Sequence, residues 1–205
     1  CNPTQDGNIS IAGIRFDASY TGTINQGTAK TITIGSSGWI QNAGTFNGLD
    51  ANITVSGDFS ISGGGFKTSS ALNTFGSNFT DPGTASLDLT AGSVRFLGPY
   101  NKTLSLTIAN RSIGGASFYG SATTFNLVGT MNVGSGGLVL RNSDYGCAIQ
   151  SGTINLTGNL TIDSTTNSAN VGCDGSAWIR LVGSANQTIT GNSYFGRTPK
   201  VEIAS

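Results

Sequence analysis

Apolar and polar residues alternate with a period of two along most of the chain, in short segments separated by glycine. The clearest example is residues 154–162, where apolar residues occupy positions 1, 3, 7 and 9 and glycine occupies position 5. The same pattern recurs at residues 125–133 and 53–61. Period-two alternation is typical of strands with one buried face, and an isolated glycine is typical of a corner. The chain is therefore predicted to be a repeat of short β-strands.

A second, longer pattern occurs twice. Residues 94–105 match residues 179–190 position by position and without a gap. Each copy is an alternating strand, a glycine corner, a short polar turn and another strand. Arg95 and Arg180 occupy equivalent positions in the two copies, which indicates a shared structural task such as stacking on or bonding to a neighbouring turn. A ligand-binding role is the alternative.

Repeated short strands with glycine and asparagine at the corners, and no helix between them, are typical of a β-solenoid. We predict an all-β fold without substantial helix, a right-handed parallel β-helix of roughly eight turns with about 20–29 residues per turn. The clearest interval is the one from Phe125 to Ile154, the first residues of two successive copies of the pattern. Turns stacked about 4.8 Å apart give a rod on the order of 40 Å long.

The domain organisation follows from the same pattern. Residues 1–205 are predicted to form one solenoid domain, with an irregular N-terminal segment at residues 1–8 and an irregular segment at residues 62–83 that is either a long loop or a degenerate turn. The strand pattern at residues 201–205 has no closing cap, and an uncapped turn leaves an edge that invites pairing. Three explanations remain open: a fragment of a longer repeat protein, a missing capping domain, or subunits that stack end to end into a filament.

Composition narrows the class of protein. The chain has 31 glycines, no histidine, 10% charged residues, and ten basic residues that balance ten acidic ones. A chain without net positive charge is not expected to bind nucleic acid. No apolar run approaches the roughly 20 residues of a membrane-spanning helix. We therefore predict a protein without a transmembrane segment.

The three cysteines are too few for a disulfide framework and lack the spacing of a metal site, so neither a metal nor a cofactor is predicted. Cys147 and Cys173 each follow a glycine, and the interval between them matches one predicted turn. We predict a disulfide between them, which implies an oxidising compartment, with two buried thiols as the alternative. For Cys1 we keep three interpretations: a lipid anchor, an intermolecular disulfide, or an arbitrary start of the chain.

Candidate chemistry is sparse. The absence of histidine excludes Ser-His-Asp and Cys-His nucleophiles and histidine-bearing metal sites. Two carboxylates still suffice for glycoside hydrolysis, or for calcium-assisted elimination of a polysaccharide. Isolated aspartates at turns usually bond their own backbone, so we predict no enzyme and no catalytic residue. The residues retained as candidates for a sugar site lie near the predicted disulfide: Arg141, Asp144, Tyr145, Asp163 and Asp174.

Two further groups of residues bear on sugars. A glycan-binding module would need exposed aromatic side chains in a row, and the candidates for stacking on a sugar are Trp39, Trp178, Tyr145, Tyr194 and Phe195. Asn-x-Ser/Thr sequons, which carry N-glycans only in a host that attaches them, begin at Asn8, Asn52, Asn78, Asn101, Asn110, Asn155, Asn159 and Asn186.

At the paired segments 94–105 and 179–190 the chain resembles repeats of large secreted bacterial surface proteins of the parallel β-helix kind, similar to autotransporter and haemagglutinin-like adhesins. The resemblance covers about residues 45–205 and rests on corner sequences, which indicate architecture and carry no catalytic residue. It implies an extracellular stalk, adhesin or filament subunit at the cell surface that continues end to end and contacts surface glycans. The alternative functions are a polysaccharide lyase or hydrolase, or a glycan-binding module, on the same scaffold.

Overall fold

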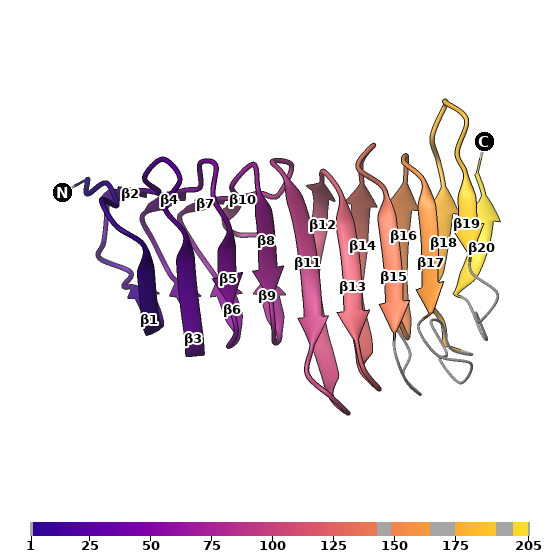
Figure 1. Ribbon diagram of the computed structural model, residues 1–205, viewed down its shortest axis with the longest axis horizontal. Helices are drawn as coiled ribbons and strands as arrows, with labels where there is room; N and C mark the ends of the chain where they lie inside the picture. The colour runs from indigo at the N-terminus through magenta and orange to yellow at the C-terminus, as the bar shows by residue number, and fades with distance from the viewer. Residues whose placement is uncertain (1, 143–148, 165–174, 192–198, 205) are drawn as a thin grey trace.

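The computed structural model describes residues 2–142, 149–164, 175–191 and 199–204, which form a parallel β-solenoid. Short strands coil around one long axis, and the two termini lie at opposite ends of the rod (Figure 1). All strand pairings within the described residues are parallel, and the same residues contain no helix. The predicted all-β solenoid of about eight turns is confirmed.

Three rows of paired strands form the sides of the coil, and we call them face 1, face 2 and face 3. Face 1 contains β1 (Ile9–Phe16), β3 (Ile32–Gln41), β5 (Ile53–Val55), β8 (Leu72–Phe75), β11 (Ser93–Gly98), β13 (Ala116–Gly120), β15 (Leu138–Asn142), β17 (Leu160–Ser164) and β19 (Ile189–Gly191). The long strands β1 and β3 continue from face 1 onto face 2.

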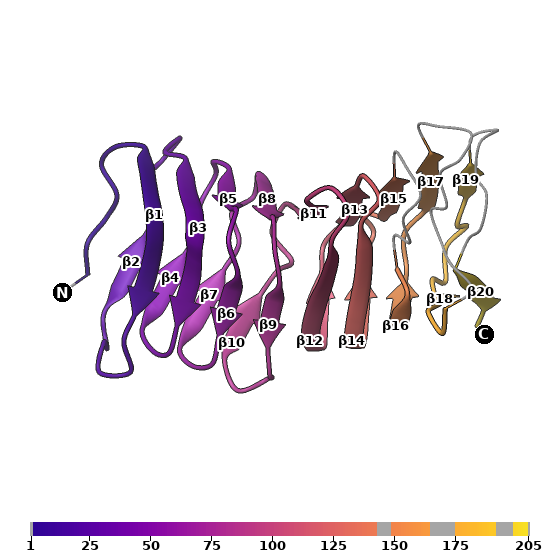
Figure 2. The same cartoon turned by 90° about the horizontal axis from the view of Figure 1, so that it is seen from below.

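Face 2 continues through β6 (Phe59–Ile61), β9 (Phe79–Asp81), β12 (Thr103–Ile113), β14 (Thr124–Val133) and β16 (Ser151–Leu156). Face 3 begins with the separate row seen in the N-terminal half of Figure 2, β2 (Thr23–Asn25), β4 (Thr45–Asn47), β7 (Gly65–Lys67) and β10 (Ser86–Asp88). A bridge from Leu89 to Ile113 carries face 3 onto the ends of β12, β14 and β16, and then to β18 (Trp178–Leu181) and β20 (Lys200–Ile203).

The strand register fixes the length of each turn. On face 1, Ile32 pairs with Ile53 and Ile53 pairs with Asn73, so these two turns have nearly the same length and are among the shortest. The longest interval between paired strand residues separates Leu160 from Ile189. The turns therefore lie within the predicted range of lengths.

The sequence pattern with glycine at position 5 occurs at all three corners of the coil, so it does not identify one particular corner. Residues 53–61 connect face 1 to face 2, residues 125–133 connect face 2 to face 3, and residues 154–162 connect face 3 to face 1. Ile154 therefore pairs with Met131 and not with Phe125, so the interval between these two copies is not a turn. The prediction failed because all three corners impose the same requirement, an inward apolar residue on each side of a glycine.

Residues 62–83, predicted as either a long loop or a degenerate turn, form a turn of the solenoid. They contain β7, β8 and β9, and Phe66, Phe75 and Phe79 point into the core and are buried. The three consecutive glycines that suggested a loop make one tight corner. Of the two interpretations the turn is correct and the long loop is wrong, because glycine-rich sequence is equally compatible with a loop and with a corner packed closely on the turn below.

Replacing Gly64 with alanine is expected to destabilise the protein by about 1–3 kcal/mol. Gly64 has a φ of +76°, and a Cβ there would lie 2.0 Å from the carbonyl oxygen of Gly44. Gly65→Ala is the matched control, because its Cβ would make an ordinary contact of 3.5 Å with Thr45. Denaturant unfolding of the two variants measures the difference, and equal losses would contradict the close-approach argument.

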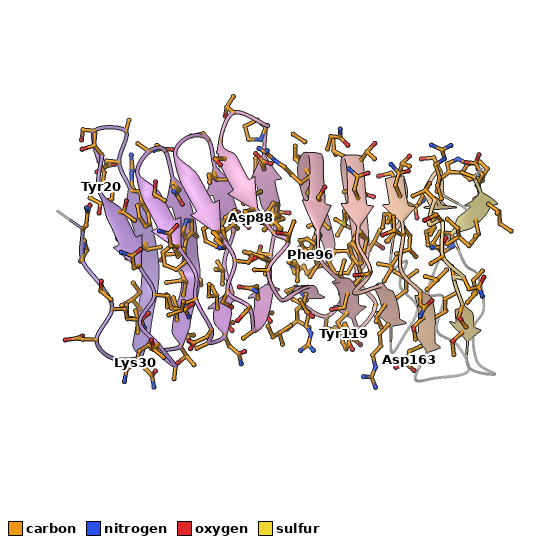
Figure 3. The ribbon with its side chains drawn as sticks, turned by 90° about the horizontal axis from the view of Figure 1, so that it is seen from above. Tyr20, Lys30, Asp88, Phe96, Tyr119 and Asp163 are labelled. Carbon is orange, nitrogen blue, oxygen red and sulfur yellow. The ribbon has the colours of Figure 1, made fainter. Side chains whose placement is uncertain are left out.

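The core is aromatic in the N-terminal part of the rod and aliphatic beyond it. Along face 2, Trp39 stacks on Phe59 with ring centroids 6.2 Å apart, and Phe59 stacks on Phe79 at 4.7 Å. Phe96, on face 1, lies inside the rod (Figure 3) and is buried. The core residues C-terminal to Phe125 include Leu127, Met131, Val133, Leu138, Leu140, Ile154, Leu156, Leu160, Ile162, Ile179 and Leu181.

Asparagine side chains connect neighbouring turns. On face 3, the amide of Asn155 donates to Asn132 at 2.9 Å, and Asn132 donates to Asn110 at 3.0 Å. Asn101 and Asn110 have φ values of +54° and +52°, the left-handed geometry that asparagine tolerates at corners. Four sequon asparagines accept a backbone N–H from the following turn: Asn8, Asn52, Asn78 and Asn159. Their glycosylation stays a prediction, as does that of Asn101, Asn110, Asn155 and Asn186.

Candidate functional site

Several predicted functional residues lie outside the described residues, so the predictions made on them stay predictions. They are the predicted disulfide partners Cys147 and Cys173, the lipidation candidate Cys1, the sugar-site candidates Asp144, Tyr145 and Asp174, and the aromatic residues Tyr194 and Phe195. The other two sugar-site candidates, Arg141 and Asp163, are described and lie together. They occupy adjacent turns of face 1, and Arg141 Nε lies 3.3 Å from Asp163 Oδ2.

Arg141 and Asp163 belong to a longer row of outward side chains on face 1. Tyr119 pairs with Arg141, which lies on the following turn. Arg95 lies one turn before Tyr119 and is offset from it by two residues along the strand. The guanidinium carbons of Arg95 and Arg141 lie 4.6 Å and 5.5 Å from the centroid of the Tyr119 ring. We call Arg95, Tyr119, Arg141 and Asp163 the arginine–tyrosine ladder; Figure 3 shows Tyr119 and Asp163 along the same long side of the rod.

A shallow groove of about 280 Å³ adjoins this ladder at the corner where the chain enters face 1. Arg95 and Tyr119 form one side of it, and Arg95 contributes the only charged side chain among its lining residues. The rest of the lining combines two aliphatic side chains, Leu72 and Val139, with small or polar residues: Ser70, Ala71, Ser93, Gly115, Ala116, Ser117, Gly136 and Gly137. The groove therefore combines one cation with hydroxyl groups. The small residues of its lining leave space for a ligand.

Arg95 and Arg180, which sequence analysis treated as equivalent, lie on different faces. Arg95 is on face 1 and stacks on Tyr119, whereas Arg180 is on face 3 and makes an ion pair of 2.7 Å with Glu202. Each contacts the following turn, so the predicted contact with a neighbouring turn is confirmed for both. Their positional equivalence is wrong, because residues 94–105 and 179–190 turn different corners.

The aromatic candidates separate into core and surface residues. Trp39 is buried between Phe16 and Phe59, and its indole N–H donates to Gln41 at 3.1 Å. Trp178 is exposed on face 3, where the ammonium of Lys200 lies 5.4 Å from its ring centroid. Trp39 therefore has no access to a sugar, and Trp178 is already covered on one side by a cation.

The described carboxylates do not cluster into a metal centre. Among the described residues there is no group of three or more His, Cys, Asp or Glu side chains that could hold a metal ion. Hydrogen bonds to Asp88, first from the Thr90 hydroxyl at 2.6 Å and then from its backbone N–H at 3.0 Å, lower the pKa of this carboxyl. A carboxyl stabilised in its charged form is an acceptor that caps its own turn, and not a general acid.

Comparisons of the chain with protein-family models, curated proteins and solved structures found no significant match. The resemblance to autotransporter and haemagglutinin-like adhesins therefore stays a prediction from sequence, whereas the β-solenoid fold rests on the structure. In the part of the chain that the structure describes, no helix is long and apolar enough to cross a membrane.

Proposed function

We propose that this chain is a rigid structural module of an extracellular stalk or filament and that copies of it stack end to end. The observation that carries the proposal is an apolar surface on the last described turn. On face 3, Ile179 and Leu181 are 1% and 7% exposed, whereas their ladder partners Val201 and Ile203 are 38% and 84% exposed. Ile189, the partner of buried Leu160 on face 1, is exposed in the same way.

A solenoid turn buries its inward side chains only when another turn stacks on it. The exposed ladder residues therefore favour a further parallel turn as their cover. The opposite end of the rod has a hollow of about 490 Å³, in which the ion pair of Arg15 and Asp17 lies beside an apolar part lined by Ile14, Phe16, Tyr20 and Ile24. A contact between two different ends is heterologous, so it repeats from copy to copy and produces a filament.

The extracellular placement rests on the sequence. Few charges, abundant Ser, Thr and Asn, and the predicted Cys147–Cys173 disulfide favour a secreted, protease-resistant rod over an intracellular protein. The outward strand positions carry many of these uncharged polar residues, including Thr33, Thr54 and Asn132. The rod is proposed to supply length and stiffness rather than chemistry.

Electron microscopy and sedimentation velocity of the purified chain test the proposal. The unmodified chain is expected to form long fibres of uniform width. Ile203→Lys places a charge on the open ladder and is expected to leave short single rods. Tyr100→Lys is the matched control, because Tyr100 is 71% exposed at the corner between faces 1 and 2 and lies away from both ends.

Two outcomes would contradict end-to-end assembly. Monodisperse short rods from the unmodified chain, over the whole concentration range, would show that no second copy covers the open ladder. Fibres formed equally well by Ile203→Lys would show that copies associate through another surface. Circular dichroism of each variant confirms that the strands are retained.

A further inference from the structure

Arg95 differs from the other described arginines in what surrounds its Nε atom. The Nε atoms of Arg15, Arg111, Arg141 and Arg180 each lie 2.6–3.3 Å from a carboxylate oxygen. The Nε atom of Arg95 is buried and has no hydrogen-bond partner. In arginine, the two terminal Nη groups form a second edge that can bind a carboxylate through parallel hydrogen bonds. Because the Nε atom of Arg95 is buried, this terminal edge is the part of the guanidinium that a ligand can reach, and no acidic side chain of the described residues pairs with it.

The guanidinium of Arg95 is held in place before any ligand arrives. It stacks on Tyr119, whose ring lies between Arg95 on the preceding turn and Arg141 on the following one. Arg141 is neutralised by Asp163, so Arg95 supplies the unpaired positive charge of the ladder. A fixed guanidinium loses little side-chain entropy on binding, which favours recognition of a small anion.

The groove beside Arg95 suits a ligand rich in hydroxyl groups. Ser70 and Ser93 are exposed at its rim and Ser117 is half-buried in its wall. Its volume of about 280 Å³ is at the lower limit for a small-molecule site, which fits a single sugar ring better than a large ligand. The Ser117 hydroxyl donates to the Val94 carbonyl at 3.5 Å and can still accept a hydrogen bond, so the lining offers hydroxyl partners for a sugar while Arg95 binds an acidic group.

An extended peptide is a poorer fit to the same groove. Peptides commonly dock by adding a strand to an open sheet edge. The strands around the groove, β8, β11, β13 and β15, are paired with neighbouring turns on both sides and offer no such edge. Recognition there must use side chains, and the polar side chains that line the groove are one guanidinium, three serine hydroxyls and the Tyr119 hydroxyl.

We propose that this groove is a binding site for a sugar acid, with the sugar carboxylate on the terminal Nη edge of Arg95 and the sugar hydroxyls on Ser70, Ser93 and Ser117. The ligand class is the uronic acid unit of an acidic polysaccharide. The inference is independent of end-to-end assembly, since the groove lies on the side of the rod.

The test compares methyl α-D-galacturonoside with methyl α-D-galactoside, which share a ring and differ in the carboxylate. Ligand titrations followed by NMR, with the Tyr119 ring signals as a local probe, are expected to show binding of the acid at least about tenfold tighter than binding of the neutral sugar. Arg95→Gln should weaken binding of the acid by about tenfold or more. Arg95→Lys keeps the charge but lacks the planar pair of Nη donors, so it should restore only part of the affinity.

Arg180→Gln is the matched control, because it removes the same charge from the corresponding sequence position on another face. It is expected to leave binding unchanged. The proposal is wrong if the galacturonoside does not bind, if Arg95→Gln binds it as tightly as the unmodified chain, or if Arg180→Gln weakens binding equally. Acetate or an acidic peptide that binds as tightly as the galacturonoside would overturn the assignment to a sugar.

Discussion

Replacing Phe59 with alanine is expected to lower the free energy of unfolding by about 3–5 kcal/mol. Phe59 is fully buried and stacks on Trp39 and Phe79, while Phe66 and Phe75 contact it edge to face at 5.0 Å and 4.9 Å. The alanine variant leaves a cavity shared by three successive turns. Those turns cannot collapse into it, because each is held in register by backbone pairing with its neighbours.

Fluorescence of Trp39, which contacts Phe59, reports the loss of stability close to the substituted residue. The chain has two tryptophans, so a Trp178→Phe background leaves Trp39 as the single fluorescent reporter of the aromatic core. Denaturant unfolding of Phe59→Ala in that background is compared with Ile40→Ala, which truncates an exposed, outward residue of β3. The control is expected to lose less than about 1 kcal/mol. Similar losses in both variants would refute the claim that the inward aromatic stack dominates stability in this half.

The sequence predicts the solenoid well because the physics of one turn is local. Inward apolar residues at every second position and glycine at the corners are needed in each turn, so the strands and the turn length are visible without the structure. The same repetition makes it impossible to read from sequence which strand residues pair between neighbouring turns. Residues 53–61, 125–133 and 154–162 read alike although they turn three different corners, so no comparison among them shows which residues are neighbours.

The site depends on register and was therefore only partly predictable. Arg141 and Asp163 were named as candidates from sequence, but their pairing needed the alignment of β15 with β17. The repeated segment of the sequence identifies Arg95, whereas Tyr119 was not among the candidates from sequence. A usable signal was the spacing along the chain, because the intervals from Arg95 to Tyr119 and from Tyr119 to Arg141 are each close to one turn. An unpaired Nε on Arg95 has no signature in sequence, because it is defined by the absence of a partner in space.

The corner that leads from β9 into β10 contains a buried ion pair that the sequence does not reveal. Arg111 Nε and Nη2 donate to the two oxygens of Asp81 at 2.6 Å and 3.1 Å. The same guanidinium donates to the Ala85 carbonyl at 2.6 Å, and Asp81 also accepts the Gly83 N–H at 2.9 Å. The hydrogen bond to Asp81 raises the pKa of Arg111, so the guanidinium stays charged and its contribution does not change across neutral pH.

Arg111→Met is expected to destabilise the protein by about 3–5 kcal/mol, because it leaves a fully buried carboxylate without a counter-charge. Arg15→Met is the matched control: its ion pair with Asp17 has nearly the same N–O distance, 2.7 Å, but is exposed. That loss should be below about 1 kcal/mol. The double variant Asp81→Asn, Arg111→Met removes the buried charge and keeps an acceptor for Gly83, so it should recover about 1–3 kcal/mol.

Denaturant unfolding measures the loss of stability in the three variants. It shows whether the contribution of the ion pair depends on its burial or only on the short N–O distance. If Arg15→Met cost as much as Arg111→Met, the short distance alone would set the energy, and the buried corner would have no special role. If the double variant were no more stable than Arg111→Met, the lost bond to the Ala85 carbonyl would account for the damage, and not the uncompensated charge. We expect the double variant to recover stability and Arg15→Met to change the free energy of unfolding very little. This combination of results would show that burial of Asp81 is the reason why the ion pair stabilises the corner between faces 2 and 3.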